Sequence, residues 1–85
     1  MSAMSDFFAD KPGWAPLQGT FTECWGNGCM CVETRCDRHG TVRYRACVLY
    51  DDRNAPRIKD MDRPTVAEAY ADALVFAERY TGGAP

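Results

Sequence analysis

The spacing of apolar residues is clearest near the end of the chain, where it has the period of an α-helix. In residues 66–80, VAEAYADALVFAERY, the alanines, aromatics and aliphatic residues fall on one arc at about 100° per residue. Thr65 and Glu68 have the spacing of a capping box, and Gly82 stands where it can end the helix. The pattern predicts a helix within residues 65–81, with Leu74 on the face that packs against the core.

Earlier segments have the composition and turn signals of β-strands. LQGTFTEC and CMCVETRC, residues 17–24 and 29–36, flank an Asn-Gly pair that is favoured in two-residue hairpin loops. TVRYRACVLY follows DRHG, residues 37–40, which predicts a type I turn closed by a glycine bulge. We therefore predict an α+β fold in the order β-β-β-α, a three-stranded antiparallel meander with one C-terminal helix packed on one face.

These elements divide the chain into one small domain of 85 residues. We expect an irregular N-terminal segment at residues 1–16, an antiparallel sheet at 17–50, a charged loop at 51–64 and the helix at 65–81. The 46% of hydrophobic residues suffices for a single core near the lower limit of domain size. The chain begins without the pattern of a secretory signal and has no apolar run of membrane-spanning length, so we expect a soluble intracellular protein with no membrane partner.

Charge bears on the class of partner. Ten basic and twelve acidic residues leave a net charge of −2, with a pI near 5.2. A general nucleic-acid binder carries a basic footprint that this balance lacks. We therefore expect no direct sequence-specific contact with nucleic acid.

The two predicted turns set a register that gathers the cysteines. An Asn27-Gly28 loop would place Cys24 opposite Cys31, and the DRHG turn would place Cys31 opposite Cys47. Cys29 would share that face, and one further cysteine, at position 36, would point to the other. The helix is expected to sit on this second face, which would hold Phe21, Trp25, Met30, Val32, Val42, Tyr44, Ala46 and Val48.

Three interpretations of the four-sulfur face remain open. In the first, which we favour, the cysteines are small apolar residues roofed by the aromatic side chains of DFFADKPGW, residues 6–14. In the second, Cys24, Cys29, Cys31 and Cys47 bind zinc, although no C-x-x-C knuckle is present. In the third, Cys24 and Cys31, or Cys31 and Cys47, form a cross-strand disulfide. On the favoured interpretation the protein needs no cofactor and carries no stoichiometric zinc as purified.

Catalytic motifs are lacking. The chain has one histidine, His39, within the DRHG turn, and no G-x-S-x-G, phosphate-binding or dinucleotide-binding motif. Cys36 and His39 form a C-x-x-H pair, but no third partner is identifiable, so the histidine is interpreted as an exposed turn residue. We expect a protein that is not an enzyme.

The chain resembles two known classes of protein, and the residues bear differently on each. The element order is similar to the latter part of a double-stranded-RNA-binding domain, but the last helix opens with Val66-Ala67-Glu68 where that family carries lysines. As a format, the short, weakly acidic sheet with one helix resembles the small inhibitors encoded by phages and mobile elements, of which anti-CRISPR proteins are the best known. That resemblance implies a protein in the bacterial cytoplasm that docks on a host protein or ribonucleoprotein complex and sterically blocks nucleic-acid processing. The alternative is a cysteine-rich, zinc-stabilised structural or regulatory module.

Binding residues are expected where aromatic and arginine side chains lie beside loops. Two places qualify, the sheet around the first turn and the start of the charged loop. The candidate partner-binding residues are Trp25, Asn27, Arg35, Arg43, Arg45, Asp51 and Asp52.

Overall fold

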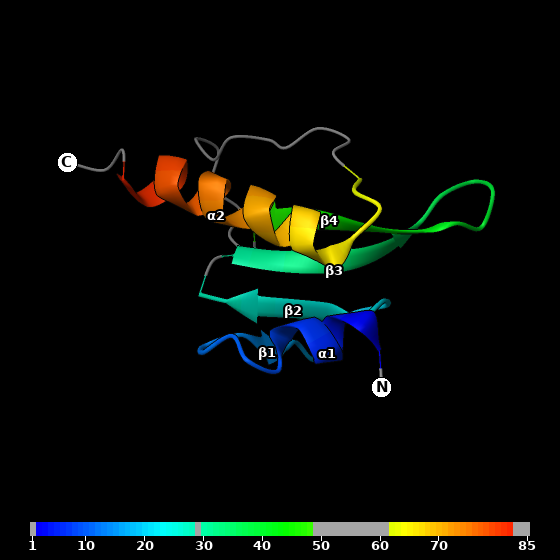
Figure 1. Cartoon of the computed structure of the whole chain (residues 1–85), viewed down its shortest axis with the longest axis horizontal. Helices are drawn as coiled ribbons and strands as arrows, with labels where there is room; N and C mark the ends of the chain where they lie inside the picture. Colours follow the sequence, from blue (N-terminus) through cyan, green and yellow to red (C-terminus); the bar gives the residue numbers. More distant parts are fainter. Residues whose placement is uncertain (1, 29, 49–61, 83–85) are drawn as a thin grey trace.

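The computed structural model describes residues 2–28, 30–48 and 62–82. Two helices and four strands follow one another along the chain (Figure 1). They are α1 (Ala3–Phe8), β1 (Ala15–Pro16), β2 (Cys24–Asn27), β3 (Met30–Cys36), β4 (Val42–Val48) and α2 (Val66–Gly82). The strands form one antiparallel sheet in the order β1-β2-β3-β4. The predicted α+β class and the C-terminal helix are confirmed, but the sheet has four strands instead of three.

Helix α1 corrects the prediction that residues 1–16 are irregular. Ser2 caps it: its hydroxyl accepts a hydrogen bond from the backbone N–H of Ser5 at 3.1 Å, and its own backbone N–H donates to the Ser5 hydroxyl at 2.9 Å. Met4 and Phe8, one turn apart, are buried. The helix has six residues, too few for an apolar period to stand out in the sequence, and its stability comes from this cap and from burial.

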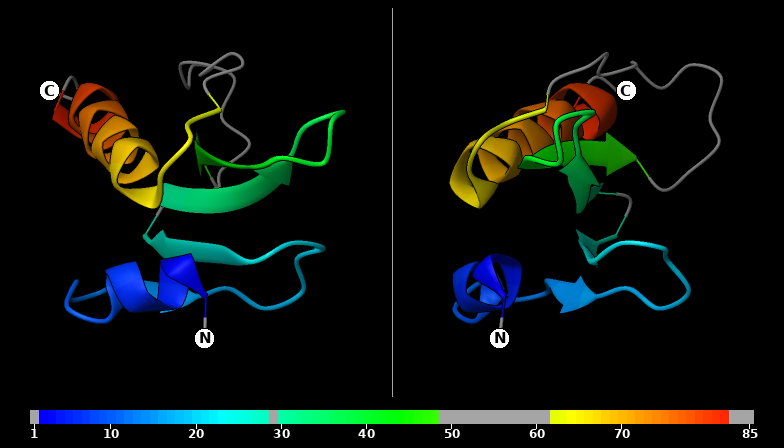
Figure 2. Two further views of the ribbon diagram at one scale, coloured as in Figure 1. Left: turned by 45° about the vertical axis from the view of Figure 1, so that its right-hand side comes forward. Right: turned by 90° about the vertical axis from the view of Figure 1, so that its right-hand side faces the viewer.

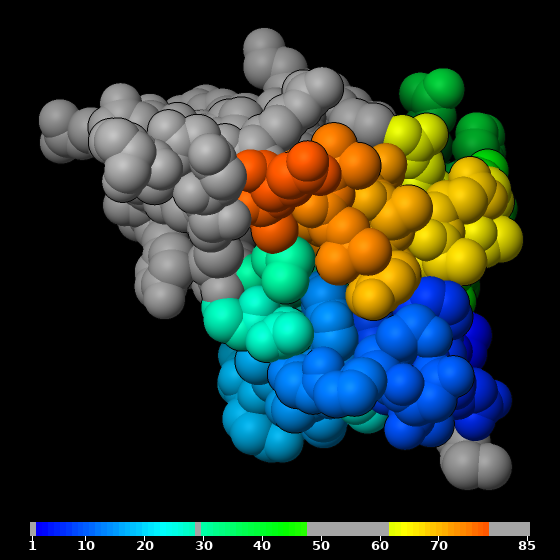
Figure 3. All heavy atoms as spheres, turned by 60° about the vertical axis from the view of Figure 1, so that its left-hand side comes forward, coloured from blue at the N-terminus to red at the C-terminus, as the bar shows by residue number. Residues whose placement is uncertain are grey.

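Both helices cover the same face of the sheet (Figure 2). An aromatic cluster centred on Phe8 joins them: its ring lies 4.8 Å from Trp14, 5.5 Å from Trp25 and 5.9 Å from Tyr70 of α2. Seen from outside, α2 lies directly against the N-terminal segment (Figure 3). The expectation that the N-terminal aromatics roof the cysteine face is therefore wrong, because they bury more apolar surface by joining the core under α2.

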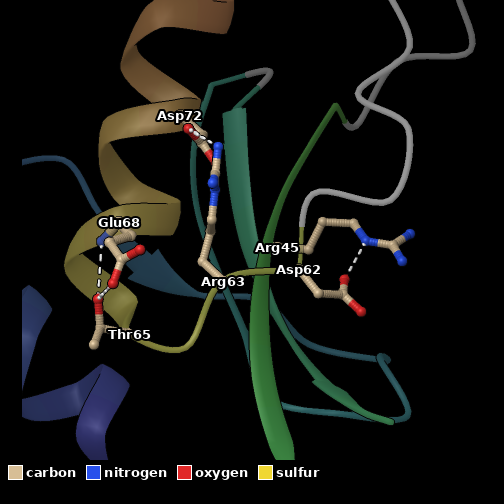
Figure 4. A network of polar contacts seen from close by, with 6 residues as sticks. All are labelled: Arg45, Asp62, Arg63, Thr65, Glu68 and Asp72. Carbon is tan, nitrogen blue, oxygen red and sulfur yellow. Dashed lines mark hydrogen bonds and ion pairs between the residues drawn. The ribbon is translucent and has the colours of Figure 1, made fainter.

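Helix α2 begins at the predicted position. The Glu68 backbone N–H donates to the Thr65 hydroxyl at 3.3 Å, and that hydroxyl donates to the Glu68 carboxylate at 2.9 Å (Figure 4). Ala69 and Ala73 are buried, so the helix lies close to β3 and β4. Leu74, placed by the sequence on the core face, is 42% exposed because it stands at the rim of the apolar arc.

The two hairpins differ in how well the sequence predicted their register. In the second, Cys31 pairs with Cys47 and Gly40 adopts φ +82°, as predicted for the bulged turn. In the first, Cys24 pairs with Glu33 instead of Cys31, a shift of two residues. Because the side-chain period of a strand is two, this shift leaves the side chains of β2 and β3 on their predicted faces.

A contact from outside the hairpin accompanies the shift. Gly26 pairs with Cys31, and a Cβ on Gly26 would lie 3.0 Å from the Leu17 Cδ1 atom. The Leu17 side chain therefore packs directly on Gly26, and a larger residue at position 26 would prevent this contact. The contact is tertiary, so the turn propensities of the sequence do not predict it.

Candidate functional site

The face of the sheet opposite the helices holds a sulfur cluster, which we define as Cys24, Cys31 and Cys47. Their three Sγ atoms lie within 4.8 Å of one another. Cys31 and Cys47, facing each other on β3 and β4 with Cα atoms 5.1 Å apart, form a disulfide. Cys24 is a free thiol. The prediction that these three cysteines share one face is confirmed, as is the pairing of Cys31 with Cys47, but Cys24 does not lie opposite Cys31 as predicted. Of the three interpretations, the structure contains the cross-strand disulfide, in its Cys31–Cys47 form.

The other two cysteines stand apart from this cluster. Cys29, a predicted zinc ligand, lies outside the described residues. Cys36 is exposed and, by the alternation along β3, points to the face opposite Cys31, as predicted. His39 lies in the turn, is exposed, and donates its backbone N–H to the Asp37 carboxylate at 2.8 Å.

The sulfur cluster is sheltered by the chain that precedes β2. Cys24 and Cys31 are buried, with 5% and 0% of their surface exposed. The backbone N–H of Leu17 donates to the Cys24 carbonyl at 2.9 Å, and the Leu17 side chain lies over Gly26 beside Cys31. Leu17 thus takes the place over the cysteines that the sequence analysis gave to the aromatic side chains of residues 6–14.

Burial sets the chemistry of the free thiol. Desolvation, with a further contribution from the negative charge of Glu33, raises the pKa of Cys24 to about 11. At neutral pH the side chain is therefore a thiol and not the thiolate that acts as a nucleophile. In the oxidised protein Cys24 is an inert apolar residue next to a disulfide.

The three candidate arginines lie on the same face as the sulfur cluster, and each has an acidic neighbour. Arg45 donates to Asp62 at 2.8 Å (Figure 4). The other two pairs, Arg35 with Glu33 and Arg43 with Asp37, have nitrogen–oxygen distances of 3.8 Å. Exposed pairs of this kind contribute little stability, but they balance the charge. The face is therefore mixed in sign and not a basic stripe.

The remaining candidate residues are not brought together with these arginines. Trp25 faces the helices, stacks on Phe8 and donates its indole N–H to Glu23 at 2.9 Å. Asn27 packs against Gly13, where an added Cβ would lie 3.0 Å from the Asn27 side chain. Asp51 and Asp52 lie outside the described residues. The binding roles of all seven residues stay predictions.

A groove that the sequence did not reveal opens where β2 begins and β3 ends. Its volume is about 570 Å³. Phe21, which the sequence placed under the helix, is fully exposed at this groove because residues 17–23 bend away before β2 starts. The groove is lined by Thr20, Phe21, Thr22, Cys24, Glu33, Thr34, Arg35 and Cys36.

One side of the groove is formed by the end of β3, where no strand pairs with it on the β2 side among the described residues. Strand β2 pairs with β3 only from Met30 to Glu33, and one more hydrogen bond runs from the Thr34 N–H to the Glu23 carbonyl at 2.9 Å. Beyond that point Arg35 and Cys36 are exposed and have no strand partner on the β2 side among the described residues. A free strand edge beside an exposed aromatic ring is a feature on which an extended peptide can dock.

Comparison with known proteins leaves the chain without an identified relative. No protein-family model matches the sequence, and neither a curated protein nor a solved structure shows significant similarity to it. In the part of the chain that the structure describes, no helix combines the length and apolar character needed to cross a membrane.

Proposed function

We propose that this protein is a small non-enzymatic binding protein that docks on a partner protein through the groove around Phe21. The exposure of Phe21 carries the proposal. A fully exposed phenylalanine adds nothing to the core, whereas aromatic side chains are common anchors at protein interfaces. The groove beside it has a volume within the range of known binding sites.

The lining of the groove favours an extended protein segment as the occupant. Thr22 lines the groove with a hydroxyl group, and the exposed edge of β3 offers backbone groups for strand addition. The hydroxyl groups of Thr20 and Thr34 already donate within the protein, to the Thr22 carbonyl and to the Met4 Sδ atom. Glu33 and Arg35 place one charge of each sign at the rim. A partner strand would pair with this edge and receive Phe21 in an apolar pocket of its own.

The format of the chain suggests the biological setting. We propose an inhibitor of the anti-CRISPR type, acting in the cytoplasm of a bacterium and obstructing a nucleic-acid-processing complex of the host. The support is the small size, the weakly acidic charge and the lack of a catalytic motif in the sequence. In this proposal the mechanism is steric, because the domain would cover a surface that the complex needs.

Photo-crosslinking tests the groove. A photoreactive phenylalanine analogue at position 21 should crosslink to the partner in bacteria that express the protein. The same analogue at Val75 is the matched control, because Val75 is also an exposed apolar residue but lies on α2. Equal crosslinking from both positions, or crosslinking from position 75 alone, would show that the groove is not the interface.

A plaque assay tests the inhibitor role separately. In bacteria with active CRISPR immunity, the protein should raise the plating efficiency of a targeted phage, and the Phe21→Ser, Arg35→Glu double variant should not. Glu78→Lys on the exposed side of α2 serves as the control substitution. If the wild-type protein leaves plating unchanged in every immune system tested, the inhibitor role is wrong even where the crosslink identifies a partner.

A further inference from the structure

The sulfur cluster has the dimensions of a metal site once its disulfide is opened. Zinc–thiolate bonds of 2.3 Å place neighbouring sulfurs about 3.8 to 4.0 Å apart in tetrahedral or trigonal geometry. The Sγ atoms of Cys24, Cys31 and Cys47 already lie within 4.8 Å of one another. Adjustments of side-chain torsions, without movement of the strands, would bring three thiolates around one ion.

The strands hold these ligands independently of the disulfide. Cys31 and Cys47 are register partners on β3 and β4, and Cys24 comes from β2, where it is unbonded and yet close to both. Three adjacent strands of one sheet therefore each supply one sulfur. Side chains on a paired sheet form a preorganised set, which lowers the cost of collecting ligands.

The sulfur cluster is buried at two of its cysteines and partly exposed at the third. Cys24 and Cys31 are buried while Cys47 is partly exposed, so an ion can enter from the β4 side and be held away from water. Three thiolates and a divalent ion carry a net charge of −1. Arg35 and Arg45 lie on the same face of the sheet, but each is already paired with a carboxylate, that of Glu33 or Asp62, so these pairs leave little net charge to act on the ion.

We propose that reduction of the Cys31–Cys47 disulfide converts the sulfur cluster into a three-thiolate site for a soft divalent metal ion of the zinc and cadmium class. A dithiol reductant supplies two electrons and two protons, is itself oxidised to a disulfide, and leaves three thiols on the protein. Binding of one divalent ion then forms three metal–sulfur bonds and releases three protons. The oxidised protein has one thiol at this place and cannot form the site.

The test uses the full chain with Cys29→Ser and Cys36→Ser, so that the sulfur cluster provides the only cysteines. The protein is reduced with a dithiol, freed of reductant under anaerobic conditions and titrated with Cd²⁺. We expect a cadmium–thiolate absorption band that saturates at one ion per chain, confirmed by native mass spectrometry, with release of three protons. The same protein left oxidised should show no band.

Removing the ligand from β2 gives the second arm of the test. Cys24→Ser in this background should weaken Cd²⁺ binding at least about tenfold and lower the release to two protons. Circular dichroism checks that the variant is folded. If the variant is unfolded, the number of protons that the parent releases on binding Cd²⁺ tests the role of Cys24. Release of two protons instead of three would show that Cys24 is not a ligand. The proposal is overturned if reduced protein binds no Cd²⁺, if oxidised protein binds it equally, or if folded Cys24→Ser binds as tightly as the parent.

Discussion

Cys24 and Glu33 lie directly opposite each other on β2 and β3, so that a buried thiol faces a carboxylate. Burial and this negative charge together raise the pKa of Cys24 to about 11 from an ordinary value of 9.0. The pairing exists because the first hairpin is shifted by two residues from the register that the Asn-Gly turn suggests. The shift therefore decides which charge the thiol faces.

We expect Glu33→Gln to lower the pKa of Cys24, because it removes the negative charge that disfavours the thiolate. The measurement is a pH titration of the Cys24 ¹³Cβ chemical shift in oxidised protein with a metal chelator present. Glu78→Gln, an exposed substitution on α2, should leave the titration unchanged. A wild-type midpoint near 9 would contradict the burial of the thiol.

The raised pKa of Cys24 also predicts how the stability of the protein depends on alkaline pH. The thiol ionises later in the folded chain than in the unfolded chain, so the unfolded state binds fewer protons between pH 9 and 11. The stabilising contribution of Cys24 is therefore complete below pH 9 and is lost as the pH rises through about 11. Urea denaturation of the wild type and Cys24→Ala at a series of pH values should show the two free energies of unfolding converging over that interval.

The Cys31–Cys47 disulfide should contribute to stability by restricting the unfolded chain. It closes a loop with a sequence separation of 16, for which the chain-entropy argument gives about 3 kcal/mol. Urea denaturation with and without a reductant, in chelator-containing buffer, measures the difference. The Cys31→Ser, Cys47→Ser double variant is the control, since it leaves Cys24 without a neighbouring thiol in the cluster and its stability should not respond to the reductant. A wild-type protein equally stable in both buffers would mean that the bond does not form in solution.

Phe8 and Phe21 should behave in opposite ways when each is replaced by Ala. Phe8 is buried among Trp14, Trp25 and Tyr70, so its removal should cost about 3 to 5 kcal/mol. Phe21→Ala should cost less than about 0.5 kcal/mol because the ring is fully exposed. Chemical denaturation of both variants checks the pair. A large loss for Phe21→Ala would remove the argument that this ring is free to bind a partner.

The ion pair of Arg63 and Asp72 should couple the segment before α2 to the helix. The Arg63 guanidinium donates to the Asp72 carboxylate through Nε at 2.6 Å and Nη2 at 3.2 Å (Figure 4). The Arg63 backbone also exchanges two hydrogen bonds with Tyr44 on β4, at 2.9 and 2.7 Å. A double-mutant cycle with Arg63→Ala and Asp72→Ala should give a coupling that favours folding and that shrinks in about 1 M salt. A coupling of zero would show that the backbone bridge alone holds this segment.

Local interactions made much of the fold predictable. The Thr65–Glu68 capping box sets the start of α2, and the DRHG turn sets the β3–β4 register because its glycine takes the left-handed conformation. These features depend on residues a few positions apart, whose preferences can be read from the sequence alone. The placement of Cys31 opposite Cys47 followed from that turn, and with it the core of the sulfur cluster.

Tertiary contacts decided the rest. Helix α1 and strand β1 are too short to form by themselves and exist because Phe8 and Trp14 join the core beneath α2. The first hairpin could have used Asn27-Gly28 as its loop, but in the folded chain Leu17 is seated on Gly26 and the register is two residues away. The exposure of Phe21 and the groove beside it follow from how residues 17–23 return to the sheet. These features depend on how much apolar surface distant segments bury against one another, and the local sequence pattern does not determine that burial.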